Sequence, residues 1–213
     1  DQSTNGLKEG ALLLYRLGHF VFGIVYRVFY RRRVYGREFL PQQGPLIICA
    51  NHIHWQDPLA IGSALPLHYE IKFMAKEELF RNPIAAFVLQ KMGAFSVDRQ
   101  KADYGAIRRS FQILNEGGVL GLFPEGSRGK PGQLQRAQKG AALIAGRSGA
   151  PVLPVLVVGP YRIGRPLKII IGPVFNLPEL EYNNKEEKKV QLEEGCRIIM
   201  DNLQMLYPAD NNA

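Results

Sequence analysis

The chain has 213 residues, 46% of them apolar and 22% charged, which is enough for one domain with a full core and too apolar for a disordered protein. The formal net charge is +8, and residues 1–37 hold seven Lys or Arg against two acidic residues. This excess predicts an anionic partner, either a membrane surface or a phosphate-bearing ligand. A basic protein could also bind nucleic acid, but no nucleic-acid-binding motif is present, so we expect no such partner.

Residues 10–30 predict a basic amphipathic helix. One side would carry a polar stripe of Arg16, His19, Gly23 and Arg27, whose first and last members lie within about 20° on a helical wheel. The opposite side would carry Leu14, Leu17, Val21, Ile24, Val25 and Val28. The longest stretch without Lys or Arg, residues 17–26, is too short to span a bilayer. We therefore interpret residues 1–34 as an interfacial membrane anchor, with a helix packed on the core as the alternative.

Residues 46–50 form an apolar run that predicts a strand buried on both faces. The run ends in a polar cluster of Asn51, His52, His54, Gln56 and Asp57. His52 and Asp57 would lie about 140° apart on a helix, so a contact between them requires a turn. Asp57-Pro58 would close that turn, because Asp favours the N-cap and Pro the first helical position.

A histidine held by a carboxylate at a strand end is typical of a general base. Two other interpretations of this cluster exist. His52 could be a structural histidine, or it could bind a metal together with His54. The metal site is the weaker of these two, because His-x-His needs a third ligand and no Cys/His cluster supplies one.

Strands and helices alternate through the rest of the chain. We expect strands at residues 71–74, 93–99, 119–123, 152–158 and 167–171, and helices at 59–65, 77–92, 104–115, 137–147 and 185–206. This alternation predicts a single α/β domain over residues 35–213, with a largely parallel sheet flanked by helices. Cys49 and Cys196 fall in apolar or helical segments, so we expect buried thiols rather than a disulfide.

Three of the predicted strands end in polar clusters, at residues 51–57, at Asp98-Arg99 and at residues 125–128. Ligands of open α/β sheets bind at the carboxyl ends of strands, so the clusters together suggest a base beside an anion pocket. Each also has a simpler interpretation: Asp98-Arg99 could be a surface ion pair, and Pro124-Glu-Gly an ordinary turn.

Four segments carry a resemblance to a known family. Residues 51–57 read Asn-His-Ile-His-Trp-Gln-Asp, a His-x4-Asp motif, and residues 123–128 read Phe-Pro-Glu-Gly-Ser-Arg. One further segment lies before the second motif, at residues 93–99, which read Gly-Ala-Phe-Ser-Val-Asp-Arg. Another lies after it, at residues 150–155, which read Ala-Pro-Val-Leu-Pro-Val. In this order the segments resemble the motifs of the glycerophospholipid acyltransferases, especially the 1-acylglycerol-phosphate (lysophosphatidic acid) acyltransferases. Two departures from the family pattern are Ser127 in place of Thr and a Phe one place early at position 95.

The resemblance implies transfer of a fatty acyl group from an acyl thioester, acyl-CoA or acyl-carrier protein, to the free hydroxyl of a lysophospholipid. The expected acceptor is lysophosphatidic acid, giving phosphatidic acid, with no cofactor and no metal. His52 would be the general base and Asp57 its orienting partner. The substrate-binding residues would be Arg99, Glu125, Gly126, Ser127 and Arg128.

The same resemblance implies membrane lipids as partners and a location at the cytoplasmic face of a membrane. Three alternatives remain for the function. They are an acyltransferase with another lysolipid acceptor or a remodelling reaction, a metal-dependent hydrolase, and a non-catalytic membrane-binding module. A serine hydrolase is disfavoured, because the chain has no Gly-x-Ser-x-Gly elbow.

Overall fold

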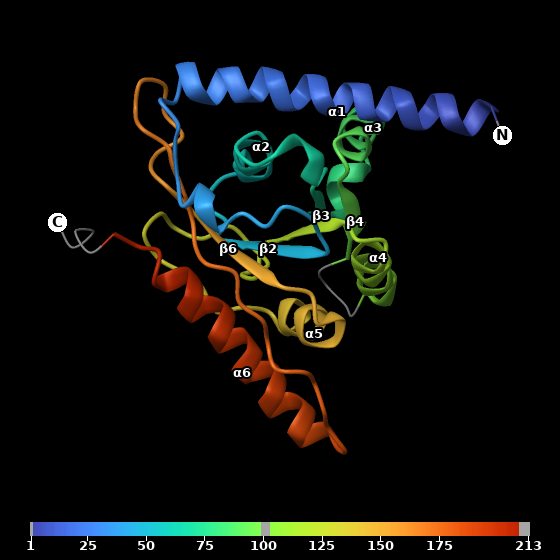
Figure 1. Ribbon diagram of the computed structural model, residues 1–213, viewed down its shortest axis with the longest axis vertical. Coiled ribbons are helices and arrows are strands. Elements are labelled where there is room, and N and C mark those ends of the chain that lie inside the picture. The colour runs from blue at the N-terminus through green and yellow to red at the C-terminus, as the bar shows by residue number, and fades with distance from the viewer. Residues whose placement is uncertain (1, 99–102, 209–213) are drawn as a thin grey trace.

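The structure is a computed structural model that describes residues 2–98 and 103–208, except for the side chains of residues 2–9, 11 and 85. Its centre is a seven-stranded sheet in the order β1-β7-β6-β2-β5-β3-β4 (Figure 1). The strands are β1 (Arg33–Tyr35), β2 (Leu46–Ala50), β3 (Lys72–Lys76), β4 (Phe95–Val97), β5 (Val119–Leu122), β6 (Val152–Val158) and β7 (Lys168–Ile171). Neighbouring strands are parallel except β6 and β7, which are antiparallel. The predicted α/β class with a largely parallel sheet is confirmed.

The helices form a layer on each side of the sheet. They are α1 (Gln2–Val28), α2 (Asp57–Gly62), α3 (Pro83–Lys91), α4 (Tyr104–Asn115), α5 (Lys139–Ser148) and α6 (Lys185–Gln204), with short 3-10 turns at Arg37–Phe39, Leu67–Tyr69 and Glu77–Phe80. In Figure 1, α1 runs across α2 and α3 on one side, while α5 and α6 cover the other. The sheet is thus covered on both faces, as parallel sheets require.

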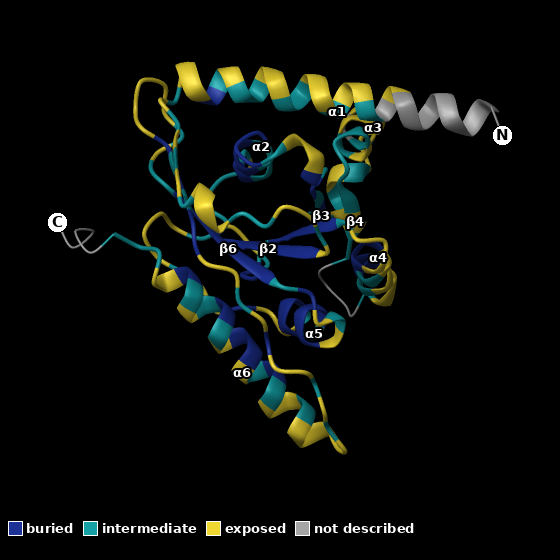
Figure 2. Ribbon diagram, viewed as in Figure 1, coloured by how far each residue is buried: buried dark blue, intermediate teal, exposed yellow. Residues whose placement is uncertain are grey.

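The central strand β2 shows why these residues form a buried strand. Leu46, Ile48 and Ala50 belong to the core under α1 and α2, whereas Ile47 and Cys49 belong to the core under α4, α5 and α6. Since side chains alternate along a strand, an unbroken apolar run fills both cores at once. Figure 2 shows the central strands β2 and β6 as buried. Cys49 and Cys196 are buried free thiols, as predicted, and burial raises the pKa of Cys49 to about 12.

Two elements differ from the prediction. The single helix expected over residues 77–92 is wrong: Glu77–Phe80 is a 3-10 turn, and α3 begins only at Pro83. Proline has no N–H and disfavours helical backbone at the preceding residue, so Asn82-Pro83 separates the two segments. The short edge strand β1 was not predicted, because its three residues have no apolar run or alternation long enough to indicate a strand.

Helix α1 rests on the domain with its predicted polar stripe partly turned inward. His19 Nε2 lies 3.0 Å from the carbonyl oxygen of Leu65, and Tyr26 is fully buried. The predicted apolar side is largely exposed, at Leu14, Leu17, Val21, Ile24 and Val28. In the part of the chain that the structure describes, no helix has the length and apolarity needed to cross a bilayer.

Candidate active site

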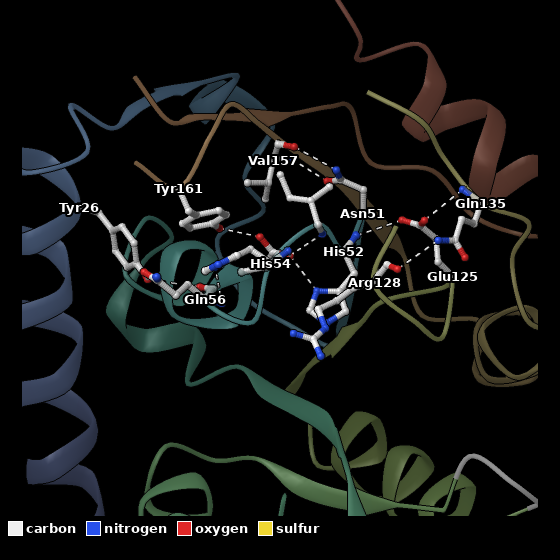
Figure 3. Close-up of polar contacts among 12 residues, drawn as sticks. Tyr26, Asn51, His52, His54, Gln56, Glu125, Arg128, Gln135, Val157 and Tyr161 are labelled. Atoms are coloured by element: carbon white, nitrogen blue, oxygen red, sulfur yellow. Dashed lines mark hydrogen bonds and ion pairs between the residues drawn. The ribbon is translucent and has the colours of Figure 1, made fainter. Parts of the chain in front are cut away.

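The site lies at the carboxyl ends of β2 and β5, which are parallel neighbours. His52 follows β2 after one residue, and Glu125 belongs to the turn after β5. The main-chain N–H of His52 donates to Glu125 Oε1 at 3.0 Å (Figure 3). The prediction that the segments 51–57 and 125–128 meet at one edge of the sheet is therefore confirmed.

Asp57 and His52 form a direct contact across a tight turn. His52 Nδ1 lies 2.7 Å from Asp57 Oδ2, and Asp57 is 0% exposed. The same oxygen accepts the N–H groups of Ile53 at 2.7 Å and His54 at 2.8 Å. The predicted N-cap role of Asp57 is wrong, because α2 begins at Asp57 with Gln56 at the cap position. Its carboxylate instead closes the turn before the helix, and that turn brings His52 to it.

The tautomer of His52 follows from this contact. An ionised carboxylate only accepts hydrogen bonds, so Nδ1 must carry the proton, which leaves the lone pair on Nε2. The imidazole stacks on Phe123, with ring centroids 4.1 Å apart and planes inclined by 20°. Phe123 in turn stacks on Phe73 at 5.6 Å. The ring of His52 is thereby oriented at its edge by Asp57 and on its face by an aromatic stack, which suits a general base.

The turn after β5 is organised by Glu125, which is 3% exposed. Its second oxygen, Oε2, accepts the N–H of Gln135 at 3.0 Å. Burial raises the pKa of Glu125, although its two backbone N–H donors act in the opposite direction. Glu125 thus holds two segments of backbone together at the site, a role that its residue type alone did not indicate.

The other predicted residues of this turn have different surroundings. Gly126 adopts φ 72°, and a Cβ there would lie 2.8 Å from the side chain of Gln138, so glycine is required. Its N–H donates to the carbonyl of Phe123 at 3.0 Å. Ser127 is exposed, and its hydroxyl donates to Gln135 Oε1 at 3.2 Å.

Arg128 is exposed next to the dyad. Burial and the nearby charge of Arg128 lower the pKa of His54, while Asp57 opposes them. Gly129, the residue after Arg128, donates its N–H to the carbonyl of His52 at 2.7 Å. Arg99 lies outside the described residues, so its predicted place beside Arg128 stays a prediction. Among the described residues, no group of three or more His, Cys, Asp or Glu could hold a metal ion.

Two more side chains complete the site: Asn51, to which sequence reasoning gave no role, and Tyr161, which it missed. Asn51 spans to β6, with Nδ2 donating to the Val157 carbonyl at 3.0 Å and Oδ1 accepting the Val157 N–H at 2.7 Å. This pair continues the β2–β6 ladder beyond the last residue of β2. Tyr161, after β6, donates its hydroxyl to Asp57 Oδ1 at 2.6 Å. No sequence pattern marks Tyr161, since it is 104 positions from its partner.

A cavity of about 620 Å³ opens beside the turn after β5. Phe123, Glu125 and Gly126 form part of its wall at the site. Apolar side chains from the sheet and from α4, α5 and α6 line much of the remainder, including Met74, Val97, Ile107, Leu122, Leu143 and Leu192. Because the Glu125 in this wall accepts the N–H of His52, the dyad adjoins a partly apolar space, which suits chemistry on a molecule with a hydrocarbon chain.

Comparison with known proteins identifies the family. Residues 31–158 match the family model described as Acyltransferase. A 1-acyl-sn-glycerol-3-phosphate acyltransferase of Bacillus subtilis is 31% identical over 169 residues, which cover 76% of this chain and 83% of that protein. A lyso-ornithine lipid O-acyltransferase of Pseudomonas aeruginosa is 30% identical over 118 residues, covering 55% of this chain and 44% of that protein.

The fold also has a solved counterpart. The crystal structure of the 1-acyl-sn-glycerophosphate (LPA) acyltransferase PlsC from Thermotoga maritima matches with a TM-score of 0.62 and 22% identity, over 97% of this chain and 83% of that one. At this identity the likeness supports the fold alone. Together with the four predicted motifs, the family match and the relatives show that this chain is an O-acyltransferase and belongs to the acyltransferase family.

Proposed function

We propose that this protein transfers a fatty acyl group from an acyl thioester to the free hydroxyl of lysophosphatidic acid, giving phosphatidic acid for phospholipid synthesis. The observation that carries the proposal is the contact of His52 with the fully buried Asp57, in a chain whose relatives include a 1-acyl-sn-glycerol-3-phosphate acyltransferase. The donor is acyl-CoA or acyl-carrier protein, and no cofactor takes part.

The reaction needs only a base and two bound substrates. Nε2 of His52 removes the proton of the acceptor hydroxyl as that oxygen attacks the thioester carbonyl carbon. The tetrahedral intermediate expels the thiolate, and the imidazolium returns the proton to the sulfur. The products are an ester and a free thiol, with His52 neutral again. Asp57 holds the imidazole in the reactive tautomer and stabilises the imidazolium.

An arginine near the dyad suits the charged part of the acceptor. Arg128 has an exposed guanidinium beside the site, and two parallel hydrogen bonds from arginine match a phosphate. We assign Arg128, with Arg99, to the acceptor phosphate. The turn residues Glu125, Gly126 and Ser127 form the adjoining wall, where both Glu125 oxygens already bind backbone N–H groups. Glu125 therefore acts on substrate mainly through the shape of the turn.

Membrane lipids supply both the acceptor and the surface on which the protein works. Helix α1 exposes Leu13, Leu17 and Phe20 at 68%, 55% and 66%, and α3 beside it exposes Ile84 and Phe87 at 76% and 57%. Arginines at the end of α1 and beyond it add attraction to anionic lipid. We propose that residues 1–34 anchor the protein in the interface, at the cytoplasmic face, where both candidate donors are found.

The test is a defined reconstitution. Purified protein is mixed with acyl-CoA or acyl-carrier protein and vesicles that contain one lysolipid at a time, and both thiol release and product lipid are measured. The proposal expects thiol release that depends on lysophosphatidic acid and matches phosphatidic acid formed, and loss of both in His52→Ala. Thiol release with free fatty acid, abolished by a chelator, would instead indicate a metal-dependent hydrolase. No thioester consumption by protein that binds vesicles would indicate a non-catalytic module.

The acceptor has one specific competitor. Because a lyso-ornithine lipid O-acyltransferase is among the relatives, a lyso-ornithine lipid belongs in the panel. Its head group lacks the phosphate, so comparing turnover with the two acceptors directly tests which of them the protein uses. Faster turnover with lyso-ornithine lipid at equal surface concentration would reassign the acceptor while leaving the role of His52 intact.

A further inference from the structure

Tyr161 lies in the connection between β6 and β7 and reaches the catalytic carboxylate from the side opposite His52. Asp57 Oδ2 accepts three donors, namely His52 Nδ1 and the N–H groups of Ile53 and His54. Oδ1 accepts the hydroxyl of Tyr161 at 2.6 Å. Because Asp57 is 0% exposed, the hydrogen bonds of this carboxylate come from the protein. Tyr161 is therefore the side chain that satisfies Oδ1 among the described residues.

The ring of Tyr161 is held in place independently of its hydroxyl. It stacks on His54, with centroids 4.4 Å apart and planes inclined by 19° (Figure 3). It also packs edge to face with Tyr26 near the end of α1 and with Tyr30 just after that helix, at centroid distances of 6.4 Å and 6.1 Å. The connection itself is tied to the same region, because the N–H of Gly164 donates to the Phe29 carbonyl at 2.7 Å. A rigid ring at this position delivers its hydroxyl to one oxygen only.

The hydroxyl stays a donor throughout the working pH range. Burial and the adjacent Asp57 carboxylate both raise the pKa of Tyr161 above its ordinary value. Tyrosine ionises near pH 10 even without such effects, so the O–H persists wherever a histidine base works. The bond to Asp57 is then a short O–H to carboxylate contact, the stronger class of hydrogen bond.

We propose that Tyr161 is a positioning residue for the acyl transfer: its hydroxyl fixes the Asp57 carboxylate and withdraws negative charge from it, and thereby sets how strongly His52 holds a proton. This inference rests on the proposed role of His52 as the base. Without the hydroxyl, Oδ1 is a buried anionic oxygen lacking its donor, and the carboxylate can rotate about its Cβ–Cγ bond. More charge then faces the imidazole, so its protonated form becomes more favourable.

Other charged and titratable groups also face the dyad, so the test must leave them unchanged. From the segment after β2 comes His54, from the turn after β5 come Glu125 and Arg128, and from α1 comes Tyr26. Tyr161→Phe removes one oxygen and keeps the ring that packs on these groups. Tyr30→Phe is the matched control, since it removes a hydroxyl from the adjoining ring and leaves every donor to Asp57 in place.

Steady-state kinetics over a range of pH provides the first measurement. In Tyr161→Phe we expect kcat to fall about tenfold, the KM values of donor and acceptor to change less than about twofold, and the acid limb of kcat/KM to move to higher pH. Tyr30→Phe should match the native profile. A folded Tyr161→Phe protein with native kcat and a native acid limb would overturn the proposal, as would an equal shift in Tyr30→Phe.

A measurement without substrate separates this inference from the proposed function. The histidine ring signals of the unliganded protein are titrated by NMR, and His52→Ala identifies the signal of His52. The midpoint of that signal should rise in Tyr161→Phe and stay at its native position in Tyr30→Phe. If the midpoint rises but lysophosphatidic acid is not acylated, the proposed acceptor is wrong and the positioning role stands. If acylation is normal and neither midpoint nor profile moves, the positioning role is wrong.

A second variant covers the case in which Tyr161→Phe does not fold. 3-Fluorotyrosine introduced at position 161 alone keeps the ring and the hydroxyl but makes the hydroxyl a stronger donor. A stronger donor withdraws more charge from Asp57, so the midpoint and the acid limb should move to lower pH, opposite to the effect of Phe. An unchanged midpoint in this protein would also overturn the proposal.

Discussion

His52 and Glu125 are joined through the backbone of one and the side chain of the other: the His52 N–H donates to Glu125 Oε1 at 3.0 Å across the neighbouring strands β2 and β5. Two motifs separated by 73 positions are thus one hydrogen-bonded unit. The second Glu125 oxygen extends this unit to Gln135, so the carboxylate holds the backbone of the base to the backbone of the loop after β5.

Glu125→Gln should weaken the site without touching the dyad side chains. The amide has one acceptor oxygen, so its NH2 group must face one of the two backbone N–H donors, of His52 or Gln135. We expect a loss of about 1–3 kcal/mol in the free energy of unfolding at neutral pH, together with a lower kcat. Urea unfolding of native and variant protein measures the first effect, and unchanged stability would show that the two bonds contribute little.

The difference in the free energy of unfolding between native protein and Glu125→Gln should depend on pH with a definite sign. Burial raises the pKa of Glu125 in the folded protein above its value in the unfolded chain. The pH-dependent part of its contribution is therefore complete below the ordinary glutamate value of about 4.3 and is lost as pH rises through the folded pKa, which leaves the hydrogen-bond difference at neutral pH. The advantage of native protein over Glu125→Gln should shrink as pH increases through this window. An advantage that grows over the same range would mean that the N–H donors outweigh burial.

His52→Ala should abolish acyl transfer while the fold persists, because the acceptor hydroxyl then has no base. General-base catalysis contributes about 10²–10⁴-fold, so a fall of about a thousandfold in kcat is expected. Asp57→Asn should also be severe, since an amide favours the wrong tautomer of His52 and cannot stabilise the imidazolium. Product lipid formation measures both. Near-native turnover by folded His52→Ala protein would exclude the proposed mechanism.

The central strand and the dyad could be predicted from sequence, because both depend on local spacing. An unbroken apolar run means burial on both faces, and a separation of five positions from His52 to Asp57 requires a turn for contact. The N-cap prediction for Asp57 is wrong for a reason that is also local. An N-cap accepts the N–H groups after it, whereas the Asp57 carboxylate accepts those of Ile53 and His54 before it.

The residues that complete the site could not be predicted, because they depend on which strands are neighbours. Tyr161 reaches Asp57 only because β6 lies beside β2, and Asn51 bonds Val157 for the same reason. The family resemblance predicts that Glu125 contacts substrate. Its bond to the His52 N–H follows from the pairing of β2 with β5, which no spacing within either motif reveals.

Arg128→Ala should weaken binding of the acceptor more than that of the donor. A charge-assisted hydrogen bond to phosphate contributes about 1.5–3 kcal/mol, which corresponds to a rise of about one to two powers of ten in the acceptor KM. Lys130→Ala is the control, because it removes an exposed charge from the same loop. Kinetics with each substrate varied in turn, for Arg99→Ala as well, decide the assignment. Loss of donor affinity alone would assign these arginines to the phosphates of CoA.

The apolar surface of α1 should bind lipid, and point variants test this better than removal of residues 1–33. Such a deletion would also remove the buried Tyr26 and the first residue of β1, and could unfold the domain. Leu17→Ser with Phe20→Ser changes only exposed side chains, so folding should be unaffected.

Burying one large apolar side chain contributes about 1.5–3 kcal/mol, so the double variant should lower partitioning onto anionic vesicles at least about tenfold. Val190→Ser on α6 is the control, since Val190 is 57% exposed but lies on the helix layer at the other face of the sheet. Added salt should weaken binding of the native protein only in part, because screening reduces the arginine contribution and leaves the apolar one. Co-sedimentation with vesicles measures each effect. Equal partitioning of native and double-variant protein would favour the alternative, in which α1 serves only as a helix packed on the core.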